Sequence, residues 1–192
     1  RCCVMLPSNS DDMGELPQSG GNVNASGTFD TSADCSAGSK LGDCQLVELA
    51  HSPDVCVCRL GDLQINGTLS VVGEPALAIF ASGSVTVDGT IDLSAAGKRS
   101  GPGVEIQAEE ASNRLGGRGG SFGTLGGSGG TARTNREIVP LAGGQAGQDG
   151  CAERAGGGGG GVVQISARGS ISVGGAIIAS AHIGNWELAA GA

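Results

Sequence analysis

The chain has 192 residues, a formal net charge of −8, and 38 glycines against one tryptophan, three phenylalanines and no tyrosine. This composition excludes a thick aromatic core, because small and β-branched side chains must do the packing, and it favours thin, stacked strands. The acidic balance, without any cluster of Lys or Arg, argues against a nucleic-acid partner. No apolar run reaches the roughly 20 residues that a membrane span requires.

Cysteine is abundant for a chain of this length. None of the cysteines lies in a CxxC motif or beside a histidine at metal-ligand spacing, so we expect disulfides formed in an oxidising compartment, and no metal or cofactor. The odd number leaves one thiol free or paired outside the chain. The disulfide candidates are Cys2, Cys3, Cys35, Cys44, Cys56, Cys58 and Cys151.

Strand character first appears in residues 22–33, which match the second half of a unit that recurs in full at residues 54–73, 76–95 and 162–181. The last two copies align without gaps, with nine identities in twenty positions. Each full copy holds three short apolar alternations, typical of strands with one buried face, separated by small residues. The pattern predicts an all-β protein, a right-handed parallel β-solenoid with coils of about 22 residues. Residues 22–33 are expected to form a stray strand apart from this stack.

The sequence VCVC at residues 55–58 leads to a prediction about the cysteines. If the two valines take the inward positions of their strand, Cys56 and Cys58 lie side by side on the outer face, held too stiffly to bond each other. Each then needs another partner, and Cys35 and Cys44 are the candidates. These bonds would staple the N-terminal segment onto the first coil.

The pair Asp88-Gly89 is also a strong signal for a hairpin turn, so a β-hairpin meander or sandwich is the alternative fold. A two-residue loop at this point would pair Val87 with Thr90 and divide the apolar side chains between the two faces. The sequence therefore favours Asp88-Gly89 as a bend between two faces of one coil.

A glycine-rich segment at residues 111–161 separates the second full copy from the third. Two interpretations of residues 116–161 stay open: a flexible excursion, or an extended chain against the solenoid, where missing side chains allow close backbone approach. We thus expect a Cys-containing N-terminal segment, 1–53, and a solenoid domain, 54–192, interrupted by the glycine-rich segment.

Candidate chemical groups are sparse. His51 and His182 have no Ser, Cys or carboxylate at a spacing that suggests a catalytic triad. Asp88 and Asp92 could bind Ca²⁺ or act as an acid–base pair with carboxylates of a stacked coil, but the third copy has glycine and isoleucine at these positions. We expect no enzymatic activity, and a polysaccharide-active β-helix enzyme is the weaker alternative.

Several stretches resemble a group of uncharacterised glycine-rich, secreted or lipoprotein-like proteins of myxobacteria. They are VCV at 55–57, GDLQINGTLSVVGEPALAIFASGSVTVDGTIDLSA at 61–95, GGSFGTLGG at 119–127 and AGGGGGGVVQISARGSISVGGAI at 155–177. The resemblance covers roughly residues 22–180 and implies a β-helical architecture and an envelope or extracellular location. It supplies no activity and no catalytic residues, and this chain is shorter than such proteins usually are.

The expected function is that of an extracellular or cell-surface structural protein that self-assembles head-to-tail into a fibre or surface layer. The open ends of a solenoid can stack on, or accept a strand from, another copy. A surface adhesin or carbohydrate-binding module that contacts extracellular polysaccharide is the alternative. The candidate assembly residues are Val23, Ala25, Phe29, Ile171, Val173 and Ile177.

Overall fold

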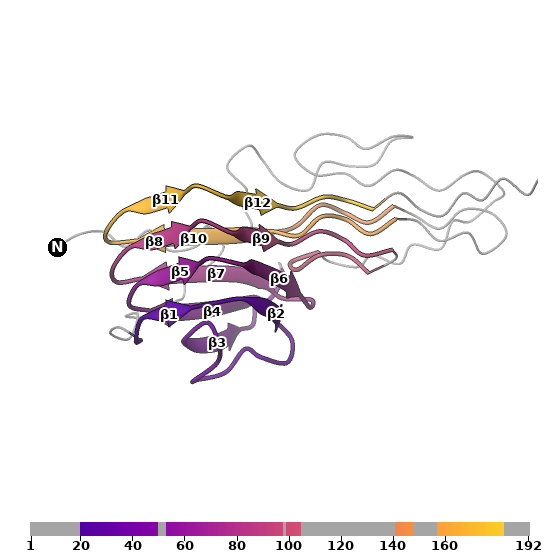
Figure 1. Ribbon diagram of the computed structural model, residues 1–192. Helices are drawn as coiled ribbons and strands as arrows, with labels where there is room; N and C mark the ends of the chain where they lie inside the picture. The colour runs from indigo at the N-terminus through magenta and orange to yellow at the C-terminus, as the bar shows by residue number, and fades with distance from the viewer. Residues whose placement is uncertain (1–19, 50–52, 98, 105–140, 148–156, 183–192) are drawn as a thin grey trace, which may run out of the picture.

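The computed structural model describes residues 20–49, 53–97, 99–104, 141–147 and 157–182, and these residues form β-strands and no helix (Figure 1). The all-β prediction is therefore confirmed for this part of the chain. The strands are β1 (Val23–Asn24), β2 (Gly27–Asp30), β3 (Asp43–Val47), β4 (Val55–Leu60), β5 (Leu63–Ile65), β6 (Thr68–Val72), β7 (Ala76–Ala81), β8 (Val85–Val87), β9 (Thr90–Asp92), β10 (Val163–Ala167), β11 (Ile171–Val173) and β12 (Ala176–Ile178).

The strands form three four-stranded sheets, in the orders β1-β5-β8-β11, β3-β4-β7-β10 and β2-β6-β9-β12. All neighbours run parallel except β3, which is antiparallel to β4. From β4 onward, strands that follow one another in the chain belong to different sheets, so each successive group of three strands makes one tier of a stack (Figure 1). The tiers are β4–β6, β7–β9 and β10–β12, and β1 with β2 makes an incomplete first tier.

The spacing of the sequence repeat matches the offset between paired residues of neighbouring tiers. Leu63 pairs with Val85, 22 residues later, and Val85 pairs in turn with Ile171 of the last copy. The strands β8 and β9, on either side of Asp88-Gly89, lie in different sheets and do not pair with each other. The hairpin alternative is therefore wrong, and this pair is a corner between two sheets.

Each tier sends its alternate apolar side chains into the narrow space that the three sheets enclose. Val85, Val87 and Ile91 of the third tier are fully buried there, and Val85 lies above Leu63, which is 1% exposed. The core therefore consists of columns of aliphatic side chains, one per strand position, in which each side chain packs on the equivalent one of the next tier.

The prediction that Cys56 and Cys58 lie on the outer face of their strand is wrong. Cys58 pairs with Ile79, and both Cys56 and Cys58 belong to the interior core, whereas the neighbouring valines lie on the outer face. The corner after β4, residues 61–62, is one residue shorter than the corner after β7, residues 82–84. A difference of one residue moves a whole strand's side chains to the other face.

The prediction that residues 22–33 lie apart from the stack is also wrong. Strand β1 pairs with β5, and β2 pairs with β6. Ala25 is 1% exposed and Phe29 is fully buried. The partial copy carries the same inward apolar positions as the full ones, and burying a phenylalanine between the sheets is worth roughly 1.5–3 kcal/mol.

Beyond the strands, residues 93–97, 99–104, 141–147, 157–162 and 179–182 run on outside the named strands. We call these segments, most of which contain glycine, the glycine lobe (Figure 1). They are joined by backbone hydrogen bonds, such as Gly144 N to Gly160 O at 2.8 Å. A Cβ atom on Gly159 would collide with the carbonyl group of Gly144. The extended-chain interpretation is thus confirmed for the described part of 116–161, and the remainder lies outside the described residues.

The corner glycines are predicted to be indispensable for stacking. A Cβ on Gly89 would collide with the carbonyl oxygen of Gly67, which also accepts a hydrogen bond from Thr90 N at 3.0 Å. We expect Gly89→Ala to lower the free energy of unfolding by about 1–3 kcal/mol, measured by urea denaturation. Gly21→Ala is the matched control, since a Cβ there meets no atom within 4 Å. Equal losses in both variants would contradict the stacking argument.

Candidate functional sites at the two ends of the stack

The N-terminal end of the stack is closed by residues 31–47, which we call the cap. It comprises a loop and β3, which pairs antiparallel with the edge of β4 at the bottom of Figure 1. Leu41 of the loop is fully buried in the interior core, below the first tier. The cap thus keeps both the apolar interior and a sheet edge away from solvent.

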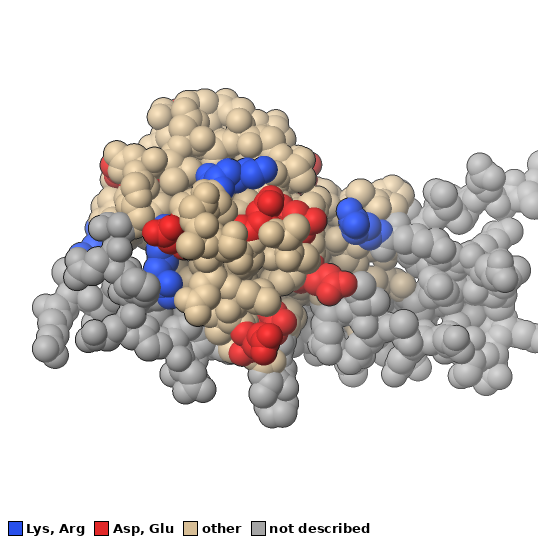
Figure 2. Space-filling model, turned by 90° about the horizontal axis from the view of Figure 1, so that it is seen from below, with Lys and Arg blue, Asp and Glu red and all other residues tan. Residues whose placement is uncertain are grey.

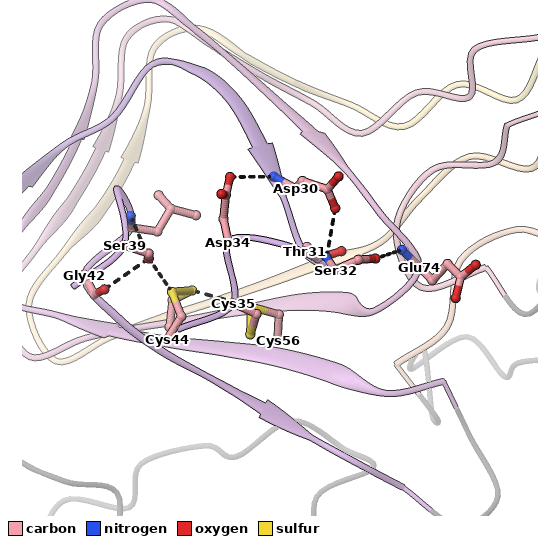
Figure 3. Close-up of a disulfide and its surroundings, with 12 residues drawn as sticks. Asp30, Thr31, Ser32, Asp34, Cys35, Ser39, Gly42, Cys44, Cys56 and Glu74 are labelled. Atoms are coloured by element: carbon pink, nitrogen blue, oxygen red, sulfur yellow. Dashed lines mark hydrogen bonds between the residues drawn. A yellow bond between two sulfur atoms is a disulfide. The ribbon is translucent and has the colours of Figure 1, made fainter. Parts of the chain in front are cut away.

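Two disulfides fasten the cap to β4, and Figure 3 shows the surroundings of the one between Cys35 and Cys56. Cys35 bonds to Cys56 and Cys44 bonds to Cys58. The prediction that Cys35 and Cys44 are the partners of the two β4 cysteines is confirmed, although the bonds lie inside the stack and not on its outer face. The other candidates, Cys2, Cys3 and Cys151, lie outside the described residues. Disulfides indicate an oxidising, non-cytoplasmic environment.

Polar contacts order the start of the cap (Figure 3). Asp30 Oδ1 accepts a hydrogen bond from Ser32 N at 2.9 Å, and Asp34 Oδ2 accepts one from Asp30 N at 3.1 Å. Ser32 Oγ accepts a bond from Glu74 N at 3.0 Å. The buried hydroxyl of Thr31 donates to the carbonyl oxygen of Val72 at 3.1 Å. These bonds tie the cap to the end of the second tier, since Val72 is the last residue of β6 and Glu74 lies two residues beyond it.

Charged side chains of both signs are scattered among other residues on the closed end, seen from below in Figure 2. Lys40 lies 3.8 Å from Asp34 and donates a hydrogen bond to the carbonyl oxygen of Thr28, on β2. Partial burial lowers the pKa of the Arg59 guanidinium, which nevertheless stays protonated at physiological pH. The lysine occupies a backbone acceptor at the edge of β2, one of the ways in which proteins protect edge strands.

The C-terminal end of the stack, in contrast to the capped end, exposes apolar side chains. The tier β10–β12, which we call the open tier, is the last of each sheet, and no strand lies beyond it among the described residues. Its inward side chains stack on fully buried ones of the tier before, for example Ile171 on Val85 and Ile177 on Ile91. The large apolar side chains of this tier that remain exposed are Ile171 (49%), Val173 (48%), Ile177 (43%) and Ile178 (40%).

The six predicted assembly residues are thus divided between the two ends. Ile171, Val173 and Ile177 lie on the open tier, whereas Ala25 and Phe29 are buried in the first tier, and Val23 packs against the same core. Because residues 22–33 are already paired within the chain, they are not a strand that can be donated to a neighbour.

The candidate chemical groups are distributed along the stack and do not converge. Asp92 Oδ1 accepts a hydrogen bond from Ser94 N at 3.0 Å, and Asp88 is an exposed corner residue. His182 follows β12, where its backbone N–H donates to Gly158 O at 2.9 Å, and His51 lies outside the described residues. Sequence reasoning missed Asp62, whose carboxylate accepts a bond from Ser84 N at 2.7 Å and links the corners of two tiers.

No family model matches the chain, and no curated protein or solved structure matches it. Within the residues that the structure describes, no helix is long and apolar enough to cross a membrane. The fold and the two ends therefore define only a class of protein. It is an all-β protein whose strands stack in tiers within three largely parallel sheets, with a disulfide-bonded cap at one end and an exposed apolar tier at the other.

The disulfides are predicted to contribute strongly to stability. They close loops with sequence separations of 21 and 14 residues, and such bonds typically stabilise a fold by about 2–4 kcal/mol. We expect the double variant Cys44→Ser/Cys58→Ser to lose this amount in urea denaturation with a chelator present. After full reduction, the variant and the parent chain should unfold at nearly the same urea concentration. A difference that survives reduction would show that the variant acts through packing and not through the bond.

Proposed function

We propose that this protein is a right-handed parallel β-solenoid with coils of about 22 residues, which acts outside the cell as a structural protein and assembles with further copies of itself through the open tier. The three-strand tiers and the 22-residue pairing offset support the solenoid. Its hand follows from the strong right-handed preference of crossover connections between parallel strands of one sheet.

The proposed assembly rests mainly on the exposed apolar side chains of the open tier. Positions whose side chains are fully buried in the preceding tier are about half exposed in this one. Covering each of these side chains would stabilise the contact by roughly 1 kcal/mol. The outer edges of the last three strands can add backbone hydrogen bonds, each worth about 1 kcal/mol net. Association costs at least about 4 kcal/mol, which offsets much of this gain, so assembly depends on protein concentration.

The closed end limits how copies can join. A head-to-tail contact needs an accepting end, and the cap with its disulfides occupies that end in the oxidised chain. Two copies can instead join open tier to open tier, which buries the same patch on both. The oxidised chain therefore forms pairs, and the head-to-tail fibre or surface layer requires release of the cap.

An adhesin or carbohydrate-binding role has less support. The aromatic side chains among the described residues are Phe29 and Phe80, which are 0% and 6% exposed. The described residues therefore offer no aromatic platform for a sugar ring, and no contact surface for a polysaccharide stands out among them.

Charge on the open tier is predicted to abolish pairing. We expect the parent chain to dimerise with increasing concentration in sedimentation velocity, and Ile171→Lys/Val173→Lys to stay monomeric because two cations would have to be desolvated. Ser172→Lys is the matched control, since this residue lies between them and faces outward. A parent chain that is monomeric at millimolar concentration, or a control that loses pairing equally, would refute assembly at this tier.

Opening the cap is predicted to convert pairs into fibres. Reduction in the presence of a chelator removes both disulfides, so the edge of β4 and the first tier become accessible to the open tier of another copy. We expect negative-stain microscopy to show fibres after reduction and discrete particles before it. Identical particles in both samples would mean that head-to-tail stacking does not occur.

A further inference from the structure

Three cysteine sulfurs lie close together where the cap meets β4, and a fourth is bonded to one of them. The Sγ atoms of Cys44, Cys56 and Cys58 all lie within 4.8 Å of one another, and those of Cys56 and Cys58 are 4.0 Å apart. Cys35 brings the fourth sulfur through its bond to Cys56. The four residues come from three separate places, namely the cap loop, β3 and β4, and Figure 3 labels Cys35, Cys44 and Cys56 among them.

This spacing suits a tetrahedral metal ion. A zinc ion with Zn–S bonds of about 2.3 Å holds its four thiolates about 3.8 Å from one another. The 4.0 Å between the sulfurs of Cys56 and Cys58 is already close to that value. Four soft thiolate ligands in tetrahedral geometry select zinc over magnesium or calcium.

The surroundings also resemble those of a structural metal site. Leu41, Leu60 and Leu63 belong to the same buried cluster and keep water away from the sulfurs. The hydroxyl oxygen of Ser39 lies 3.0 Å from Cys44 Sγ and can donate a hydrogen bond to a thiolate there. Such second contacts orient a ligand and tune its basicity.

We propose that, in the reduced chain, Cys35, Cys44, Cys56 and Cys58 bind one Zn²⁺ ion, which replaces the two disulfides as the fastening of the cap. Two equivalents of a dithiol reduce the two disulfides, each becoming a disulfide itself, and supply four electrons and four protons. Zinc binding then releases the four thiol protons to solvent. The cap is closed in the oxidised chain by sulfur–sulfur bonds and in the reduced chain by the metal.

The test uses the full chain with the other cysteines replaced, Cys2→Ser/Cys3→Ser/Cys151→Ser, so that four thiols remain. Reduced without oxygen, mixed with Zn²⁺ and desalted, it is expected to retain one zinc per chain by atomic emission. Co²⁺ in place of Zn²⁺ should give the thiolate-to-cobalt charge-transfer absorption of a tetrathiolate site. The oxidised form of the same chain is expected to retain no metal.

The ligand variant is Cys58→Ser in this background, which should weaken zinc binding by at least about 100-fold, since even indirect partners of metal ligands are worth about 10–100-fold. Cys35→Ser, whose site is only partly buried, serves as a second variant if Cys58→Ser does not fold. Zinc should also protect residues 31–42 of the reduced chain from proteolysis. A reduced background chain that retains no zinc, or zinc binding unchanged by both variants, would overturn the proposal.

Discussion

The register between tiers is the constraint on which the rest of this structure depends. Parallel pairing places each side chain directly over its equivalent in the neighbouring tier, as with Leu63, Val85 and Ile171. An aliphatic side chain in such a column is covered above and below by its equivalents, so a thin core made mainly of Val, Ile and Leu is sufficient with Phe29 as the aromatic side chain of the interior cluster among the described residues. The same register brings the corner backbones into contact, which is why Gly67 and Gly89 stack there without side chains.

A stack held together in this way must end, and the two ends show different solutions. At the N-terminal end, the cap supplies Leu41, an antiparallel strand and two disulfides, and the first tier is buried. At the other end, inward positions equivalent to buried ones of the other tiers, such as Val173, remain about half exposed because no tier of the described residues covers them. The proposed assembly and the proposed zinc site both follow from this asymmetry, since one concerns the exposed end and the other the fastening of the closed end.

The sequence predicted the correct disulfide partners of Cys56 and Cys58 from an incorrect assignment of the faces of their strand. The ungapped comparison of repeats put Val55 and Val57 inward, and a corner shorter by one residue put Cys56 and Cys58 there instead. The partners remained Cys35 and Cys44 because these residues lie in the segment that precedes β4 and can reach either face. Ile178 was missed for a related reason: it takes the outward position of Asp92, where the other copies indicate a polar side chain.

The repeats in the sequence were enough to predict their own strands, the spacing of about 22 residues, the corners, and the need for glycine where backbones touch. These are local properties, set by alternation and by the absence of a Cβ. Strand β3 lies outside the repeats and was not predicted. The structure was also needed to show which face the cysteines take, that residues 22–33 form the first tier, and which end is open. Strands β8 and β11 have nearly the same pattern, yet Val85 is buried and Ile171 is exposed, because burial depends on whether another tier lies above.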